Sequence, residues 1–278
     1  MKMLADHVVL IAGAGSGLGR GLARYFLDDG AQLALMEVSP AKVESLRDEF
    51  GDKVLVVEGD VTRIDHILAC RDAVSKRFGR LDGLVCAHGI FDGMVPLKNT
   101  PLEKLQSLFD EVFHINVLGN MLLARAFHDL LEAAGGAIVM TSSQAAYAAD
   151  GGGLIYTASK GAVVSMVKQL GFEFAPRVRV TGVAPAAIAN SELRGPMALG
   201  MEHRRQSDIP KEAFMETFRS LALLAELPTP ENYAPLYAFL VSRHNKIMTG
   251  QTVIADQGML NRAILTRKDG TLAGGVGG

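Results

Sequence analysis

The chain of 278 residues is 49% hydrophobic and 21% charged, and its formal net charge is −2. That charge gives no electrostatic basis for binding nucleic acid or an anionic membrane surface, which favours a small-molecule partner. The apolar run at 8–12 is too short for a signal-peptide core or a membrane span, which predicts a cytoplasmic protein. With no repeat or biased linker, we expect one domain over residues 1–265 and a flexible, glycine-rich tail over 266–278.

Short apolar runs alternate with amphipathic segments of helical length through the first two thirds of the chain. Continuous apolar runs predict buried strands, whereas apolar residues three and four apart predict helices. The expected strands cover 7–12, 32–36, 54–57, 81–86, 137–142 and 178–183. The expected helices cover 18–28, the segments that begin at 40 and after 62, an interrupted or bent stretch at 102–131, and 156–174.

Three expected helices carry signals at their ends. Gly30 tolerates left-handed dihedral angles and so ends the first helix. Ser39 and Pro40 offer the second helix a capping hydroxyl and a proline in its first turn. Thr62 and Asp65 have the spacing of a capping box, with Asp in place of Glu.

The alternation of strands and helices predicts an α/β fold, a Rossmann-like doubly wound parallel sheet covered by helices on both faces. Such sheets bind ligands beyond the carboxyl ends of their strands. The loops that gather there are expected at 12–19, 37–40, 59–62, 86–93, 142–153 and 184–200.

The cysteines and histidines predict no special chemistry. Cys70 and Cys86 fall on an expected helix and an expected strand, which indicates buried, reduced thiols rather than a disulfide. The seven histidines show no metal-ligand spacing with one another or with the cysteines, so we expect no metal.

Gly13, Gly17 and Gly19 stand at the first junction of strand and helix, where a glycine-rich turn and a helix N-terminus can hold a pyrophosphate. A tight turn without a ligand is the alternative. Glu37 lies roughly 20 residues further on, at the end of the second strand, where an acid binds the adenosine ribose. No Lys or Arg occurs at 12–19 or 36–41 to neutralise a 2′-phosphate, so we expect NAD rather than NADP. Asp60 follows the third strand and is expected either to contact the adenine amino group or to cap a helix.

Tyr156 and Lys160 are four residues apart on one face of an expected helix, and Ser143 lies on the loop after the fifth strand. The Lys160 ammonium group, like the positive nicotinamide ring, favours the phenolate and so lowers the phenol pKa from about 10, which lets Tyr156 take a proton from an alcohol as hydride leaves. Ser143 is placed to hold the substrate oxygen. A pair of Tyr and Lys on a helix surface is the alternative when these two residues are considered alone.

Taken together, the glycine spacing, the Ser-Tyr-Lys pattern and the element order resemble the short-chain dehydrogenase/reductase family over about residues 5–260. The resemblance implies a catalytic group of Ser143, Tyr156 and Lys160, with Asn116 of HINVLG relaying protons through water to the lysine. It also implies a set of contacts to the dinucleotide. Those contacts are Gly13, Ser16, Gly17, Leu18, Gly19, Glu37, Asp60, Val61, Ala87, Gly89, Tyr156, Lys160, Pro185 and Ile188.

Longer stretches at 109–120, 150–164, 172–183 and 192–201 are similar to the bacterial cis-dihydrodiol dehydrogenases of the biphenyl and naphthalene type. That similarity implies NAD-dependent oxidation of an aromatic cis-dihydrodiol to a catechol, and a homotetramer. A segment at 184–215, which includes a loop and a helix within 184–200, is expected to cover a flat apolar substrate, with simple core packing as the alternative for each side chain. The expected substrate contacts are Ser143, Gln144, Phe91, Leu193 and Met197.

The chain also departs from the family pattern. It has Ala12 where Thr is usual, Cys86-Ala87-His88-Gly89 in place of Asn-Asn-Ala-Gly, Ala186 and Ala187 in place of glycines, and Gln144 in place of a smaller Asn. His88 either adds a hydrogen bond beside the nicotinamide or is a neutral structural residue. These changes keep open a dehydrogenase of another cyclic alcohol, such as a monocyclic terpenoid allylic alcohol. A non-catalytic NAD-binding regulator is the alternative from a different class.

Overall fold

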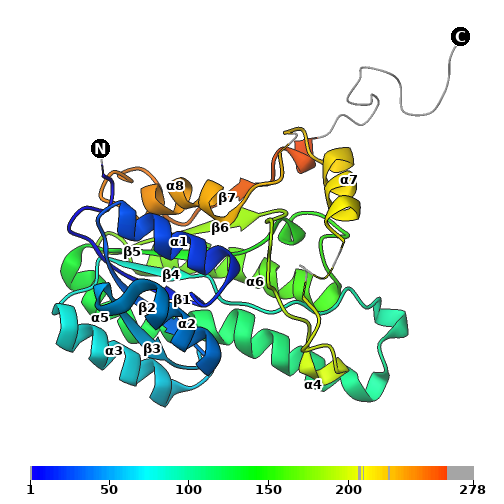
Figure 1. Ribbon diagram of the computed structural model, residues 1–278, viewed down its shortest axis with the longest axis horizontal. Helices are drawn as coiled ribbons and strands as arrows, with labels where there is room; N and C mark the ends of the chain where they lie inside the picture. The colour runs from blue at the N-terminus through cyan, green and yellow to red at the C-terminus, as the bar shows by residue number, and fades with distance from the viewer. Residues whose placement is uncertain (1, 206–207, 209, 225, 262–278) are drawn as a thin grey trace, which may run out of the picture.

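The computed structural model describes residues 2–205, 208, 210–224 and 226–261, and its centre is a seven-stranded sheet (Figure 1). The strand order is β3-β2-β1-β4-β5-β6-β7, and every neighbouring pair is parallel. The order reverses between β1 and β4, which opens a crevice at their carboxyl ends. The strands are β1 (Val8–Ala12), β2 (Gln32–Glu37), β3 (Val54–Glu58), β4 (Gly83–Cys86), β5 (Ala137–Thr141), β6 (Arg179–Pro185) and β7 (Thr252–Ala255).

Helices cover both faces of the sheet, so its strands are buried on both sides. On β1, Leu10 packs into a core built with α3, α5 and α6, whereas Val9 and Ile11 pack into a second core with α1, α2 and α8 (Figure 1). The fold is therefore the expected doubly wound, Rossmann-like single domain. The helices are α1 (Gly17–Asp28), α2 (Pro40–Phe50), α3 (Ile64–Phe78), α4 (Leu102–Phe113), α5 (Gly119–Ala134), α6 (Leu154–Glu173), α7 (Lys211–Leu221) and α8 (Pro230–Val241).

The expected interruption of the long helix is confirmed. A π-helical turn over His114–Leu118 separates α4 from α5. Such turns insert an extra residue into a helix and occur frequently at functional sites. Here the turn carries Asn116, whose side chain accepts a hydrogen bond from the Ile90 backbone and donates one back to it.

Most predicted boundaries agree with the structure within two residues, but two predicted caps are wrong. Ser39 stands at the start of α2 without a capping hydrogen bond from its hydroxyl. The residue before α3 is Arg63, and the Thr62 hydroxyl donates to Asp60 instead of forming a capping box. Gly30 does end α1, with φ of +93°.

The segment after β6 is mostly irregular. The only helical piece described between 186 and 205 is a short 3₁₀ turn over Met197–Leu199, so the helix expected within 184–200 is absent there. An isolated antiparallel bridge joins Arg194 to Arg205. Residues 206–207 and 209 of the expected covering segment, and the expected tail at 266–278, lie outside the described residues.

Both cysteines are buried and unbonded, as expected. Burial raises the pKa of the Cys70 and Cys86 thiols to about 12, so both are protonated at neutral pH. Among the described helices, none combines the length and the apolar character needed to cross a membrane.

Candidate active site

A cavity of about 390 Å³ opens at the carboxyl ends of the central strands and joins the glycine loop to the predicted catalytic residues. The structure brings nearly all the expected cofactor contacts to its wall. The residues concerned are Gly13, Ser16, Gly17, Leu18, Glu37, Asp60, Val61, Ala87, Gly89, Tyr156, Lys160, Pro185 and Ile188.

The glycine spacing follows from close contacts in the first turn. Gly13 has φ of +82°, and a Cβ there would lie 2.6 Å from the backbone of His88. Gly19 is the one expected cofactor contact that does not line the cavity. It packs inside the turn, where a Cβ on it would lie 2.1 Å from the carbonyl oxygen of Gly13. The Ser16 hydroxyl does not cap α1, so the first amides of that helix are available to a phosphate. The loop therefore fits a dinucleotide pyrophosphate.

Glu37 is buried and oriented at the end of β2. Its Oε2 accepts from the Gly15 amide at 2.9 Å, and its Oε1 accepts from the Ser39 amide at 3.0 Å. Each carboxylate oxygen keeps a further lone pair that can accept from a ribose hydroxyl.

Lys42 also lines the cavity, just beyond the 36–41 window in which no cation occurs. Its Nζ donates to the Ser16 hydroxyl at 2.6 Å and pairs with Glu192 at 3.1 Å. The expectation of no cation near the ribose end therefore needs correction, although this cation has an acidic partner.

Asp60 is partly committed to the turn before α3. Its Oδ1 accepts from both the backbone amide and the hydroxyl of Thr62, each at 2.8 Å. Because Asp60 also lines the cavity, a contact to adenine stays a prediction.

Tyr156 and Lys160 lie on the first turns of α6, and both are buried against the end of β5. Lys160 Nζ donates to the carbonyl of Thr141 at 3.0 Å and lies 5.6 Å from the centre of the Tyr156 ring. The Ser142 hydroxyl donates to the Lys160 carbonyl at 2.8 Å and ties α6 to the sheet. Ser143, the next residue, lines the same cavity.

Burial dominates the titration of this pair. It raises the pKa of Tyr156 to about 12, while a hydrogen bond with Ser143 lowers it and the charge of Asp92 raises it. Burial also lowers the pKa of Lys160 to about 8. Lys160 is not among the groups that shift the pKa of Tyr156 here, so a lowering by this ammonium group and a bound nicotinamide ring stays a prediction.

Asn116 acts as a brace behind the catalytic residues. Besides its two bonds to Ile90, its Nδ2 donates to the Ser159 hydroxyl at 3.1 Å, and that hydroxyl donates to the Tyr156 carbonyl. A Cβ on Gly89 would lie 3.2 Å from Asn116 Oδ1 and 3.4 Å from Lys160 Nζ, so both side chains lie close to Gly89. A proton relay through water stays a prediction.

Asp92 holds the start of α6, a role that the sequence analysis missed. Its Oδ1 accepts from the Gly153 amide and its Oδ2 from the Tyr156 amide, both at 2.9 Å. Oδ1 also accepts from the Met94 amide at 3.2 Å. The carboxylate therefore satisfies amides that the first turn of α6 leaves unpaired.

The expected substrate contacts are divided between the cavity and its surroundings. Ser143 and Leu193 line the cavity, whereas Gln144, Phe91 and Met197 do not. Phe91 packs edge-on against the Tyr156 ring, with 5.0 Å between ring centres. Met197 is 63% exposed.

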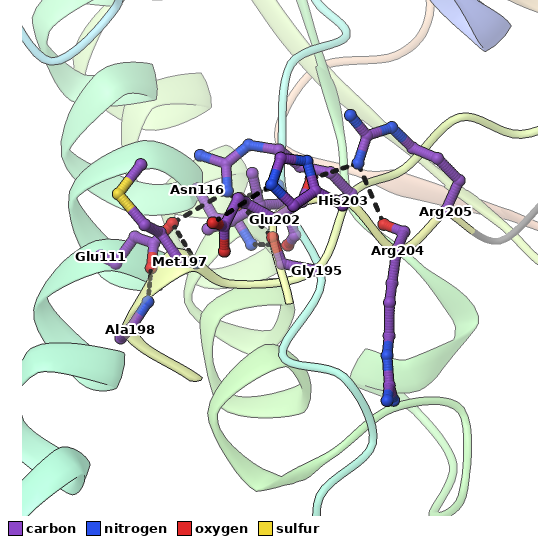
Figure 2. A network of polar contacts seen from close by, with 11 residues as sticks. Glu111, Asn116, Gly195, Met197, Ala198, Glu202, His203, Arg204 and Arg205 are labelled. Carbon is purple, nitrogen blue, oxygen red and sulfur yellow. Dashed lines mark hydrogen bonds and ion pairs between the residues drawn. The ribbon is translucent and has the colours of Figure 1, made fainter. Parts of the chain in front are cut away.

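Glu111 on α4 anchors the expected covering segment, several residues of which line the cavity (Figure 2). Its carboxylate pairs with Arg194 at 2.9 Å and accepts from the backbone amides of Met197 and Ala198. This contact spans more than eighty positions in sequence, so no local pattern could have revealed it.

His88 lines the cavity, but its ring nitrogens are hidden from solvent and have no hydrogen-bond partner among the described residues. Burial, and then the charge of Lys160, lowers the pKa of His88 to about 3. The neutral form is therefore present at physiological pH.

The crevice thus places a buried phenol and amine beside a loop shaped for a dinucleotide, which defines an oxidoreductase that uses a nicotinamide cofactor. Residues 13–260 match the family described as enoyl-(acyl carrier protein) reductase. The chain belongs to the short-chain dehydrogenase/reductase family and acts on CH–OH donors.

Similar proteins support this assignment. The chain is 40% identical over 265 residues, 95% of its length and 97% of the other, to a 3-phenylpropionate-dihydrodiol/cinnamic acid-dihydrodiol dehydrogenase of Escherichia coli O7:K1. A solved short-chain type dehydrogenase/reductase of Mycobacterium marinum has 26% identity and a TM-score of 0.76, with 92% of this chain and 96% of that chain covered. A glucose/ribitol dehydrogenase-type structure from Brucella melitensis has 26% identity and a TM-score of 0.78, with 93% and 99% covered.

Proposed function

We propose that this protein oxidises an aromatic cis-dihydrodiol to the corresponding catechol, with NAD as the hydride acceptor. The observation that carries the proposal is the buried Tyr156, beside Ser143 and Lys160, in the wall of the dinucleotide cavity. The identity of 40% to an enzyme named for dihydrodiol substrates supports the substrate class.

Glu37 supports NAD over NADP. Its carboxylate is held by two backbone amides at the ribose end of the cavity, where it would repel a 2′-phosphate. Lys42 does not offset this effect, because it is paired with Glu192. Glu37→Ala is expected to lower the ratio of kcat/KM for NAD to that for NADP by at least tenfold, and an unchanged ratio would refute the assignment.

The residues divide the chemistry among them. NAD⁺, when bound along the glycine loop, would supply the acceptor for the hydride of the carbinol carbon. Tyr156 as phenolate removes the proton from the hydroxyl on that carbon, and Ser143 donates a hydrogen bond to the same oxygen. Lys160, as its protonated form, stabilises the phenolate. The enone that results tautomerises to a catechol, and aromatisation favours the forward reaction.

Steady-state kinetics test the substrate class. Purified protein with NAD is given a panel of aromatic cis-dihydrodiols and of cyclic allylic alcohols, and NADH absorbance is followed. We expect higher kcat/KM for the dihydrodiols. Higher values for the allylic alcohols would establish the alternative substrate class, and no turnover of either group would favour a non-catalytic NAD-binding role.

We also propose a homotetramer. An apolar patch on the interrupted helix supports self-association, since Phe109 is 45% and Met121 is 46% exposed and both line a shallow hollow there. Light scattering after size exclusion is expected to give about four times the chain mass of 29.7 kDa. A monomeric mass would contradict this proposal.

A further inference from the structure

Four cationic side chains belong to residues that line the cavity, and three of them have an assigned partner or task. Lys42 pairs with Glu192, Arg194 pairs with Glu111, and Lys160 belongs to the catalytic group. The fourth, Arg205, has no acidic partner within salt-bridge distance in the described part of the chain. A cation at a cavity wall without a counter-charge is a candidate to bind an anion.

Arg205 lies at the substrate end of the cavity. Its backbone forms a bridge with Arg194, and the Arg194 carbonyl accepts from the Phe91 amide at 2.9 Å. Phe91 in turn packs against the Tyr156 ring. Arg205 is therefore linked to the Tyr156 ring through three successive contacts, whereas Lys42 lies at the opposite end, beside Ser16.

The Arg205 guanidinium is held in place by backbone groups alone. Its Nη1 donates to the carbonyls of Glu202 and Arg204 (Figure 2). Within the described residues, its Nε and Nη2 donate to no protein acceptor. A guanidinium with one nitrogen anchored and the others free presents the planar fork that binds carboxylates.

The acids nearest in sequence do not occupy this fork. The Glu202 carboxylate lies 3.6 Å from His203, and the Asp208 carboxylate accepts from the backbone amide of Arg205. Glu111 is taken by Arg194 and by two backbone amides. Asp208 and Glu111 therefore have other partners, whereas Glu202 Oε2 is buried without a hydrogen-bond partner among the described residues and lies beyond salt-bridge distance of Arg205.

We propose that Arg205 binds a carboxylate on the substrate, so that the substrate class is aromatic cis-dihydrodiols carrying an acidic side chain. This inference rests on the proposed function and narrows it. The ring would lie against Leu193 near Tyr156, with its side chain extending along the covering segment to Arg205. The similar enzyme of Escherichia coli is named for dihydrodiols of 3-phenylpropionate and cinnamic acid, which both carry a carboxylate.

A matched pair of substrates tests the inference. The cis-dihydrodiols of 3-phenylpropionate and of 3-phenylpropionamide have the same shape and differ in charge. For the wild-type protein we expect kcat/KM for the acid to exceed that for the amide by about 10-fold to 100-fold, the range of a lost hydrogen bond to a charged group. Equal values would overturn the inference while leaving the proposed function intact.

Two variants assign the effect to one side chain. Arg205→Met keeps the apolar stem and is expected to bring the ratio of kcat/KM for the acid to that for the amide close to one. Arg204→Met removes the same charge from the adjacent, exposed residue and is expected to keep the preference. A preference that survives in Arg205→Met, or that disappears in Arg204→Met, would overturn the assignment.

Direct binding separates failure of this inference from failure of the proposed function. Calorimetry with the NAD-loaded protein measures 3-phenylpropionate against 3-phenylpropionamide, neither of which has a hydroxyl to oxidise. Tighter binding of the acid to wild type but not to Arg205→Met would support the subsite even if no dihydrodiol were turned over. Equal binding of the two compounds to wild type would refute it.

Discussion

Asp92 provides a sharp test of how the catalytic helix is positioned. Its side chain is only 2% exposed and accepts from the amides of Gly153 and Tyr156 at the start of α6. Losing a helix cap costs about 0.5–2 kcal/mol, and a hydrogen bond to a charged group contributes about 1.5–3 kcal/mol. We therefore expect Asp92→Ala to lower the free energy of unfolding by about 3–4 kcal/mol, since both the cap and the charged acceptor are lost.

Urea denaturation measures this loss, and two other variants make it specific. Asp92→Asn keeps one carbonyl oxygen for Gly153 but turns an NH₂ group toward the Tyr156 amide, so we expect a smaller loss of about 1–2 kcal/mol. Asp129→Asn changes an acid that is 83% exposed and is expected to stay within about 0.5 kcal/mol of wild type. An Asp92→Ala midpoint equal to that of wild type would refute this account of α6.

The same substitution predicts a change in the pH profile. The negative charge of Asp92 raises the pKa of Tyr156, so Asp92→Asn is expected to lower that pKa. Oxidation needs the phenolate, so the acidic limb of kcat/KM should move to lower pH. An acidic limb that stays in place, or moves to higher pH, would contradict the electrostatic role of Asp92.

Three further predictions concern buried or crowded positions. Burial lowers the pKa of Lys160 to about 8, so at pH 7 the buried charge destabilises the folded state. We expect Lys160→Met to be inactive yet about 1–3 kcal/mol more stable in urea at pH 7, and we expect this gain in stability to disappear above pH 10.5. Equal stability of the variant and the wild type at pH 7 would contradict this prediction. The pKa of His88 in the folded state is about 3, so the free energy of unfolding should fall as the pH drops from 6.5 toward 3. His88→Ala should make this dependence of stability on pH weaker, and an unchanged dependence would contradict the prediction. Gly13→Ala would force a Cβ to 2.6 Å from the His88 backbone, so this variant should unfold at a lower urea concentration than the wild type. A Cβ on Gly161, within α6, would meet nothing within 4 Å, so Gly161→Ala should stabilise the protein by about 0.5–1 kcal/mol. Similar urea midpoints for the two variants would refute this reasoning.

The sheet and the catalytic residues were predictable because their signals are local. A strand such as β1 reads as an apolar run since helices bury both of its faces, and Tyr156 and Lys160 share a helix face at a spacing visible in sequence. After residue 183, the sequence analysis predicted only a helix within 184–200, which the structure does not show. Later in the chain, α8 contains Pro235, which ordinarily argues against a helix, and only its tertiary packing against α1 shows that it forms one.

The parts of the site that escaped prediction depend on contacts between distant segments. In the sequence, Asp92 is an ordinary acidic residue of a loop. Its role becomes visible only in the fold, where the backbone amides at the start of α6, 61 positions later, donate to its carboxylate. Glu111 similarly looks like a surface residue of α4 until the covering segment reaches it. Lys42 lies one position outside the window in which cations were sought, and only the fold of α2 brings it to Ser16.

Single-turnover kinetics of Tyr156→Phe tests the central claim most directly. The variant removes one oxygen from a buried side chain and leaves the dinucleotide loop in place. With saturating NAD and a cis-dihydrodiol, we expect the rate of NADH formation to fall by about 10²-fold to 10⁴-fold, while the Kd for NAD changes less than threefold. NADH formation at the wild-type rate would contradict the assignment of Tyr156 as the base.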